Sequence, residues 1–179
     1  INNAGISPKR QGQPPKPNEI DVQEWERVMR VNVTAPFLLS RDLVSGMIER
    51  QFGRIVNITS AMVKSPRPHM ALSTSARTGL TAFSKSLSLD IAVDNVTINN
   101  LLPERIDTPR QEFLAQRLVK LHKITYEEAR QQIINTIAAK RMGTPEEFAD
   151  ACAFLCSAQA GFISGQNLQL DGGSYPGLI

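Results

Sequence analysis

The stretch GRIVNITS, residues 53–60, decides the fold class of this sequence. It is short, rich in Ile and Val, and bounded by Gly53 and Ser60. A run of this kind is typical of a strand that is buried on both faces, as the strands of a parallel sheet are. We therefore expect a parallel β-sheet at the centre of the molecule.

Segments with helical periodicity alternate with further extended segments on both sides of this strand. Apolar residues recur at helical spacing from Asp21, a suitable N-cap, to Arg50, so this part is one long helix or two helices joined near Asn32. Apolar steps of three or four predict another helix over residues 73–95, and VTINNLLP, residues 96–103, predicts the next strand. Alternation of this order predicts an α/β fold with a doubly wound parallel sheet.

The remaining segments fit the same pattern. INNAGIS, residues 1–7, resembles the end of a buried strand, and residues 8–20, with four prolines, predict a loop. Residues 111–139 are polar and helical with a break near HKIT, and a further helix begins with Thr144 as N-cap. GQNLQLDGG, residues 165–173, predicts a last strand that ends in a tight glycine turn. We expect one domain over residues 1–179.

The composition excludes several classes of protein. The chain has 179 residues, of which 41% are hydrophobic and 21% charged, as in an ordinary globular domain. The formal net charge of +3 is too small to indicate nucleic acid or an anionic membrane as partner. No apolar run reaches the roughly 18 residues that span a bilayer, and we recognise no signal-peptide pattern in these residues; we expect a cytoplasmic protein.

The two cysteines, Cys152 and Cys156, lie four residues apart in a predicted helix. This spacing is neither that of a CxxC redox pair nor that of a zinc knuckle. We expect two small buried residues on one helical face, and no metal site.

The candidate site lies where the predicted strands end. In doubly wound sheets, ligands bind beyond the carboxyl ends of the strands. The residues that follow the predicted strands are Asn3, Ala4 and Gly5, then Thr59 and Ser60, then Pro103 and Glu104 through Thr108.

These strand-end residues resemble those of the short-chain dehydrogenase/reductase family over nearly the whole chain. NNAG at residues 2–5 is similar to the family motif after its fourth strand, and GRIVNITS is similar to its fifth strand. LPERIDT, residues 102–108, resembles the PGxxxT segment, and ISGQNLQLDGG the closing strand. The pattern is most similar to the 3-oxoacyl-carrier-protein reductase and glucose-dehydrogenase-like branch.

The resemblance implies a Rossmann-like fold, an NAD or NADP cofactor and a carbonyl or alcohol substrate. It also implies a lid at about residues 109–141, and a homo-tetramer or dimer built on the long helices and the last strand. The catalytic positions that it implies are Asn32, Ser60, Ser73 and Arg77. The cofactor-binding positions that it implies are Asn3, Ala4, Gly5, Thr59, Arg77, Pro103, Glu104, Ile106 and Thr108.

Three departures from the family pattern bear on activity. The glycine-rich TGxxxGxG turn does not occur in this sequence, so we expect the chain to be the C-terminal portion of a larger Rossmann-fold domain. Ser73, thirteen residues after Ser60, and Arg77 stand where the family has Tyr and Lys, so YxxxK has become SxxxR. Glu104 replaces the glycine after Pro103, which adds bulk and negative charge.

The SxxxR change removes the expected proton donor. A tyrosine with a pKa near 10, lowered by a lysine, is a useful general acid, whereas a serine ionises far less readily. Arg77 supplies a fixed positive charge and stays protonated. His69 and Lys64, in the loop before Ser73, are alternative proton donors, although a loop histidine is usually just solvated.

Two tyrosines elsewhere are further alternatives. Tyr126 precedes Arg130 by four residues and imitates a YxxxR motif, but its segment is the expected lid. Tyr175 lies in the tail and is interpreted as a packing or subunit contact. Asn3, Asn32 and Ser60 each also have a structural interpretation: a strand bridge, an opened helix turn and a strand-end cap.

Two functions therefore remain open from the sequence. The first is an NAD(P)-dependent oxidoreductase with an atypical active site. The second is a catalytically impaired pseudoenzyme that keeps the fold for cofactor binding or oligomer assembly.

Overall fold

The centre of the molecule is a three-stranded parallel sheet, as the sequence predicts. The computed structural model describes residues 1–7 and 15–178. The strands are β1 (Gly53–Ile58), β2 (Val96–Pro103) and β3 (Asn167–Leu170), in the order β1-β2-β3. Asn2 extends the sheet beyond β1, because its N–H donates to Val56 O at 2.8 Å and its carbonyl accepts from Ile58 N at 2.9 Å.

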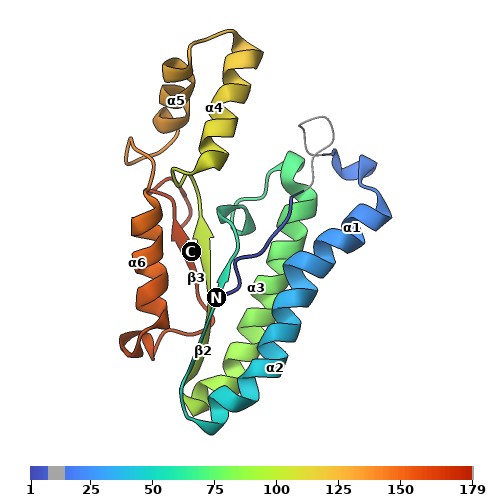
Figure 1. Cartoon of the computed structure of the whole chain (residues 1–179), viewed down its shortest axis with the longest axis vertical. Helices are drawn as coiled ribbons and strands as arrows, with labels where there is room; N and C mark the ends of the chain where they lie inside the picture. Colours follow the sequence, from blue (N-terminus) through green and yellow to red (C-terminus); the bar gives the residue numbers. More distant parts are fainter. Residues whose placement is uncertain (8–14, 179) are drawn as a thin grey trace.

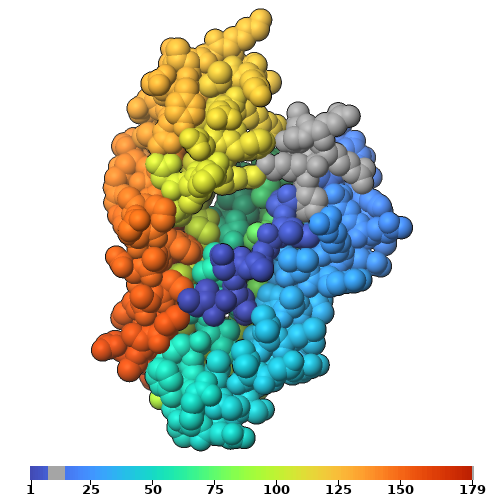
Figure 2. Space-filling view, in the orientation of Figure 1, coloured from blue at the N-terminus to red at the C-terminus, as the bar shows by residue number. Residues whose placement is uncertain are grey.

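Helices cover both faces of the sheet (Figure 1). The helices are α1 (Val22–Met29), α2 (Ala35–Glu49), α3 (Ala71–Ile91), α4 (Pro109–His122), α5 (Tyr126–Asn135) and α6 (Pro145–Cys156). Helices α2 and α3 pack on one face, and α6 packs on the other. In the space-filling view the N-terminal residues cross the molecule between these two layers (Figure 2). The doubly wound α/β architecture is thereby confirmed.

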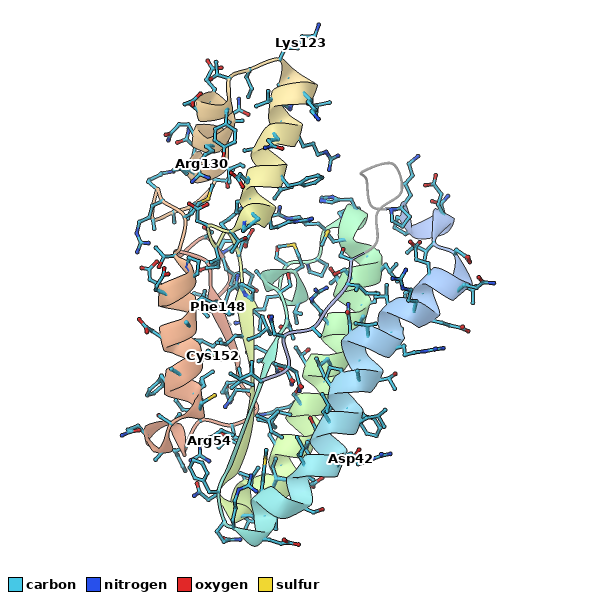
Figure 3. The ribbon with its side chains drawn as sticks, viewed as in Figure 1. Asp42, Arg54, Lys123, Arg130, Phe148 and Cys152 are labelled. Atoms are coloured by element: carbon cyan, nitrogen blue, oxygen red, sulfur yellow. The ribbon has the colours of Figure 1, made fainter. Side chains whose placement is uncertain are left out.

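Apolar side chains of β1 and β2 divide between the two helical layers. Ile55 and Ile98 pack with α3 residue Ile91, whereas Val56 and Leu101 pack with α6. Phe148 and Cys152 point from α6 toward the sheet (Figure 3). Both sets of strand residues are buried because a parallel sheet in this fold class is covered twice.

Several element boundaries differ from those expected. The helix predicted over residues 73–95 is α3, which begins at Ala71 and gives way to a 3-10 turn after Ile91. The segment predicted as helical to Ala139 ends at Asn135, although its predicted break near HKIT is confirmed. Helix ends depend on local capping and often shift by one or two residues from a periodicity estimate.

The predicted loop over residues 8–20 is only partly described. Residues 8–14 lie outside the described part of the chain, and Pro17–Glu19 form a 3-10 turn rather than loop. The predicted N-cap Asp21 is confirmed, because its carboxylate accepts from Gln23 N at 3.1 Å. The glycine turn after β3 is also confirmed, since Gly172 and Gly173 have left-handed φ values of 63° and 76°.

A π-helical segment joins α1 to α2. It spans Arg30–Thr34, so the two helices are continuous and the irregularity lies at Asn32. The buried Asn32 side chain pairs with the backbone of Ile6, donating to its carbonyl at 2.9 Å and accepting from its N–H at 2.8 Å. Asn32 therefore fixes the N-terminal segment against the helical layer.

A row of asparagines runs across the sheet. Asn2, Asn57, Asn100 and Asn167 occupy paired register positions on four adjacent segments. Their amides form successive side-chain hydrogen bonds of 2.7, 3.2 and 2.8 Å, and α3 residue Ser84 bonds to both central members.

Within the described residues, no helix is long and apolar enough to cross a membrane.

Candidate active site

A cavity of about 580 Å³ lies beyond the carboxyl ends of β1 and β2. Six of the residues that the sequence marks as a site line it: Asn3, Ser60, Pro103, Glu104, Ile106 and Thr108. They come from three strand ends, which the parallel sheet brings to one edge. The loop before α3, helix α4 and the start of α6 complete the wall.

Ser60 lies in this wall at the turn after β1. Its backbone is extended, with φ −169°, and its Oγ accepts a hydrogen bond from Met62 N at 3.2 Å. The serine therefore caps the 3-10 turn Ala61–Val63, which matches its structural interpretation. Because Oγ accepts in this bond, its O–H remains free to donate to a ligand.

Ser73 and Arg77 form a hydrogen-bonded pair on α3. The Arg77 guanidinium donates to Ser73 Oγ, one helical turn away. Ser73 is buried at 4% exposure, and neither residue lines the cavity. Burial lowers the pKa of Arg77 from its ordinary value. Ser73 and Arg77, the two positions that depart from YxxxK, are thus hydrogen-bonded to each other.

Gly5 packs closely against this pair and against Asn32. A Cβ atom at Gly5 would lie 3.3 Å from Arg77 Nη2 and 3.5 Å from Asn32 Oδ1. Asn32 uses its side-chain amide on Ile6, so the amide is engaged with the protein itself. Three of the predicted site positions therefore meet here, adjacent to the chain segment that contributes Asn3 to the cavity. Ala4 is exposed and does not line the cavity. Thr59 is buried, and its hydroxyl donates a hydrogen bond to Leu101 O at 3.4 Å.

Glu104 is held by an arginine from the opposite wall. Its carboxylate lies 3.2 Å from Arg67 Nη2, and its backbone N–H donates to Leu170 O at 2.9 Å. The left-handed residue of this turn is Arg105, with φ 59°, and not Glu104. The effect of replacing glycine at position 104 therefore lies in the added carboxylate and not in backbone strain.

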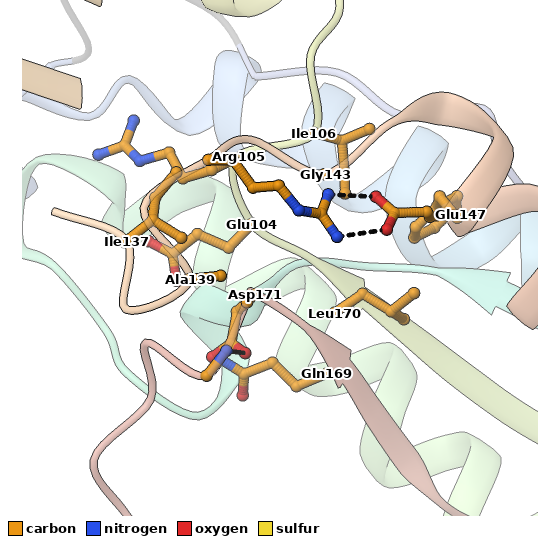
Figure 4. A pocket seen from close by; sticks show the side chains of 14 residues that line it. Glu104, Arg105, Ile106, Ile137, Ala139, Gly143, Glu147, Gln169, Leu170 and Asp171 are labelled. Atoms are coloured by element: carbon orange, nitrogen blue, oxygen red, sulfur yellow. Dashed lines mark hydrogen bonds and ion pairs between the residues drawn. The ribbon is translucent and has the colours of Figure 1, made fainter. Parts of the chain in front are cut away.

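A second cavity, of about 300 Å³, adjoins the first (Figure 4). It shares Glu104, Arg105, Ile106 and Phe148 with the larger cavity and is otherwise lined by the segment between α5 and α6, the start of α6 and the end of β3. Arg141 and Glu147 form a bidentate ion pair at 2.6 and 2.8 Å on its wall. None of the predicted catalytic residues lines it.

Comparison with known proteins is consistent with this arrangement. The sequence model of a family described as "Enoyl-(Acyl carrier protein) reductase" matches residues 1–175. The chain belongs to the short-chain dehydrogenase/reductase family. Its likeness to the 3-oxoacyl-carrier-protein reductases is thereby confirmed by the relatives that follow.

Three related proteins show how much of a family member this chain represents. It is 34% identical to nodulation protein G of Rhizobium sp. (strain N33) over 173 residues, which are 97% of this chain and 64% of that protein. It is 33% identical to the 3-oxoacyl-[acyl-carrier-protein] reductase FabG of Haemophilus influenzae over 153 residues, covering 86% of this chain and 59% of that protein.

A solved structure agrees with these sequence relatives. The structure of YwfH, described as an NADPH dependent reductase involved in bacilysin biosynthesis, superposes with a TM-score of 0.84 at 30% identity. It covers 98% of this chain and 66% of that one. This short-chain dehydrogenase/reductase chain thus spans about 60% of the length of the curated relatives above.

The alternative proton donors of this short-chain dehydrogenase/reductase occupy different places. His69 lines the larger cavity, as Glu104 and Ile106 do. Lys64 lies over the Tyr175 ring, with its Nζ 5.6 Å from the ring centroid, which agrees with a packing contact for Tyr175. Tyr126 packs in the apolar cluster between α4 and α5 and does not line the cavity.

Arg130 and the cysteines have structural surroundings. Arg130 binds the Asp107 carboxylate with bonds of 2.8 and 3.2 Å, and the pKa of Arg130 is raised by these bonds and by Tyr126. Cys152 and Cys156 are free thiols on α6; Cys152 is buried as expected, whereas Cys156 is only half-buried. Among the described residues, no three His, Cys, Asp or Glu side chains gather to hold a metal ion.

Sequence reasoning missed several members of the cavity wall. They are Arg67, Arg110, Gln111 and Arg117, whereas Arg105 lies in the marked segment from Glu104 to Thr108 but was given no role. The signal for two of these was present: Arg110 and Arg117 share one helical face with Leu114 in the segment after Thr108. A basic helical face beside a predicted strand end would have identified them.

Proposed function

We propose that this chain provides the substrate-binding half of an NAD(P)-dependent oxidoreductase that interconverts a carbonyl compound and an alcohol. The observation that carries the proposal is the single cavity lined by Asn3, Ser60 and the segment from Pro103 to Thr108. The reductases among its relatives support the reaction class.

The chain's residues fit the nicotinamide half of such a cofactor. Gly5 lets the segment after the first strand end pack closely against Arg77 and Asn32, which holds the neighbouring Asn3 in the cavity wall. Pro103, Ile106 and Thr108 offer an apolar surface and one hydroxyl beside Ser60. The cofactor, when bound, supplies a hydride to the carbonyl carbon.

Ser60 is the residue that holds the substrate oxygen in this proposal. Its Oγ already accepts from Met62 N, so its hydrogen is directed to another acceptor, such as a carbonyl oxygen. Arg77 supplies a fixed positive charge against Gly5, outside the cavity wall, and Asn32 keeps the segment around Gly5 in place through its bonds to Ile6. Replacing Ser60 removes the only serine hydroxyl in the described wall of the cavity.

The proton for the developing alcohol is the weak point of this site. Ser73 is buried, bonded to Arg77 and absent from the cavity wall, so it cannot reach a ligand there without rearrangement. Solvent water or His69 remains as the donor. We therefore expect slow turnover.

The same Ser73–Arg77 pair favours a second candidate function. A buried pair that satisfies itself is compatible with a pseudoenzyme that binds the cofactor or assembles into oligomers without catalysis. The exposed Phe37 and Leu38 on α2 support assembly into a homodimer or tetramer. We place the protein in the cytoplasm as part of the same proposal, with residues 109–141 as its lid.

Cofactor binding and turnover separate the two functions. The full-length protein is titrated with NADH and with NADPH by fluorescence, which also decides the cofactor. It is then assayed with ketones, sugars and 3-oxoacyl thioesters, beside a Ser60→Ala variant. Turnover that Ser60→Ala abolishes supports the oxidoreductase, and cofactor binding with no turnover on any compound supports the pseudoenzyme. If neither cofactor binds, the oxidoreductase and the cofactor-binding pseudoenzyme are both refuted, and only a role in oligomer assembly is left.

A further inference from the structure

The wall of the larger cavity carries a strong excess of positive charge. Its charged residues are Arg67, Arg105, Arg110, Arg117 and Glu104, with His69 beside them. Four arginines face one carboxylate, in a protein whose whole formal net charge is only +3. A cavity with walls of one sign of charge concentrates ligands of the opposite sign.

Glu104, the single carboxylate in the described wall, interacts with arginines on one side of the cavity. Glu104 pairs with Arg67 at 3.2 Å and is only 17% exposed. Three effects act on the pKa of Arg105. Burial lowers this pKa, the charge of Glu104 raises it, and the charge of Arg67 lowers it. The negative charge of the wall is therefore already shared between these two arginines.

Helix α4 contributes the other two arginines without any counter-charge. Within residues 1–7 and 15–178, neither Arg110 nor Arg117 has an ion pair or a side-chain hydrogen bond. They lie seven residues apart with Leu114 between them, on the helical face that lines the cavity. Arg110 stands in the first turn, where the helix dipole disfavours a cation and favours an anion.

A buried polar group next to Arg110 also lacks a partner. Gln111 is only 7% exposed and lines the cavity, and its Oε1 atom is buried without a hydrogen-bond partner. Buried polar atoms are nearly always paired in folded proteins. Gln111 therefore adds an unpaired acceptor to the polar groups around Arg110.

We propose that the substrate of this site is an anionic carbonyl compound or hydroxy compound, whose carboxylate or phosphate is bound by Arg110 and Arg117 of α4. The inference rests on the proposed function for the role of the cavity. It goes further by assigning the charge of the substrate and the two residues that select it. A neutral acyl chain would leave both guanidinium groups without a counter-charge.

Matched pairs of ligands test this inference without any cofactor. The full-length protein is titrated by ligand-observed NMR with 3-oxobutanoate and its neutral methyl ester, and with dihydroxyacetone phosphate and dihydroxyacetone. We expect at least one anion to bind about tenfold or more tightly than its neutral partner, and added salt to weaken that difference. The pair that shows the preference distinguishes a carboxylate ligand from a phosphate ligand.

Variants assign the preference to α4. The change Arg110→Gln with Arg117→Gln is expected to abolish it, whereas Lys120→Gln is the matched control. Lys120 is exposed on the same helix and does not line the cavity. Arg117→Lys, which keeps the charge, is expected to retain most of the preference, and circular dichroism verifies that each variant is folded.

Three results would overturn the inference: equal affinity for acid and neutral partner, a preference that survives loss of both arginines, or no binding of any of the four probes. These results are distinguishable from failure of the proposed function. An inactive protein can still prefer the anions, and an active reductase can still bind acid and ester equally.

Discussion

At the scale of single residues, the decisive positions are Ser73 and Arg77. They are bonded to each other inside the helical layer and take no part in the cavity wall. A hydroxyl with an ordinary serine pKa has no base beside it, because a guanidinium cannot accept a proton. Under the proposed function, Ser60 would hold the carbonyl oxygen, and no fixed general acid would stand beside it.

Restoring the acid should raise activity. In the double variant Ser73→Tyr with Arg77→Lys, we expect the turnover number to rise by about 10²- to 10⁴-fold, the usual contribution of a positioned general acid. The measurement is steady-state kinetics with the best substrate and cofactor found for the unchanged protein. Ser73→Phe with Arg77→Lys is the control for packing. If the Phe and Tyr variants are equally active, the missing proton donor is not what limits the rate.

The asparagine row predicts a stability effect at one residue. Asn100 bonds to Asn57, Ser84 and Asn167, and it is 1% exposed. Asn100→Leu removes these bonds at nearly constant volume, and each buried group left unpaired costs about 1 to 3 kcal/mol. We expect the free energy of unfolding in urea to fall by about 2 to 4 kcal/mol.

The control for this substitution is an exposed asparagine. Asn135 lies at the end of α5, and Asn135→Leu should change the free energy of unfolding by less than about 0.5 kcal/mol. If both substitutions lowered the free energy of unfolding equally, the asparagine row would contribute no more than any other asparagine replaced by leucine.

At the scale of elements, the sequence pattern and local capping agree most closely at α6. The Thr144 hydroxyl accepts a hydrogen bond from Glu147 N at 3.1 Å, and the Glu147 carboxylate accepts one from Thr144 N at 2.9 Å. These two bonds form a capping box. Arg141 adds two bonds to the same carboxylate. Together these donors lower the pKa of Glu147 from 4.5 to about 2.

This lowered pKa predicts a particular acid dependence. The folded state binds the Glu147 proton less well than the unfolded state, so the carboxylate contributes stability above pH 4.5 that is lost as the pH falls toward about 2. We expect urea unfolding of the unchanged protein to become easier across this interval, and Glu147→Gln to flatten that part of the profile. Salt should reduce the difference because the pair is exposed. A profile that is identical in both proteins would contradict the assignment.

The α4–α5 hairpin is an element that packs mainly on itself. Its apolar cluster comprises residues of both helices, such as Ala115 and Ala129, and it projects from the end of the sheet (Figure 1). The Arg130–Asp107 pair ties α5 to the segment that follows β2. Mobility of this hairpin would control entry to the cavity that α4 lines.

Loss of this tie should loosen α5 selectively. In Arg130→Gln, we expect faster amide hydrogen exchange in α5, with exchange in α3 and α6 unchanged, because the hairpin has few other contacts with the sheet. Mass spectrometry of the exchanged peptides measures this. Glu127→Gln, an exposed change in the same helix, should leave α5 as protected as before. Uniform loss of protection over all helices would instead indicate global destabilisation.

At the scale of the whole molecule, exposed apolar groups on the helical layer bear on assembly. Phe37 of α2 and Phe83 of α3 form an edge-to-face pair with centroids 5.2 Å apart, and Phe37 remains 38% exposed. Leu38, next to it, is 37% exposed. Apolar groups gathered on one surface are typical of protein interfaces.

The proposed homo-oligomer can be disrupted at this surface. A charge in the centre of an apolar interface is strongly unfavourable, so we expect Phe37→Glu to convert a dimer or tetramer into smaller species. Size-exclusion chromatography with light scattering gives the masses. Leu89→Glu, on a side chain of α3 that is 73% exposed, is the comparison that shows whether Phe37 is special. A protein that is monomeric before any substitution would refute the assembly proposal.

The amino-acid pattern is sufficient to predict the class of the fold and the edge of the sheet at which the candidate site lies. The composition of residues 53–58 predicts a buried strand, because an apolar β-branched run is stable only when both of its faces are covered. The alternation with helical segments then fixes where the strand ends lie, and six strand-end residues do line one cavity. These features depend on local order, which a linear pattern records.

Only the tertiary structure decided which side chains meet. The Ser73–Arg77 pair, the Glu104–Arg67 ion pair and the asparagine row each depend on rotamers or on contacts between segments far apart in the chain. An asparagine in each apolar strand was visible in the sequence, but whether four amides align depends on strand register. Likewise, the basic wall of the cavity arises because α4 turns Arg110 and Arg117 toward a space that other elements enclose. Helical spacing gives a residue's face, and packing alone determines what that face meets.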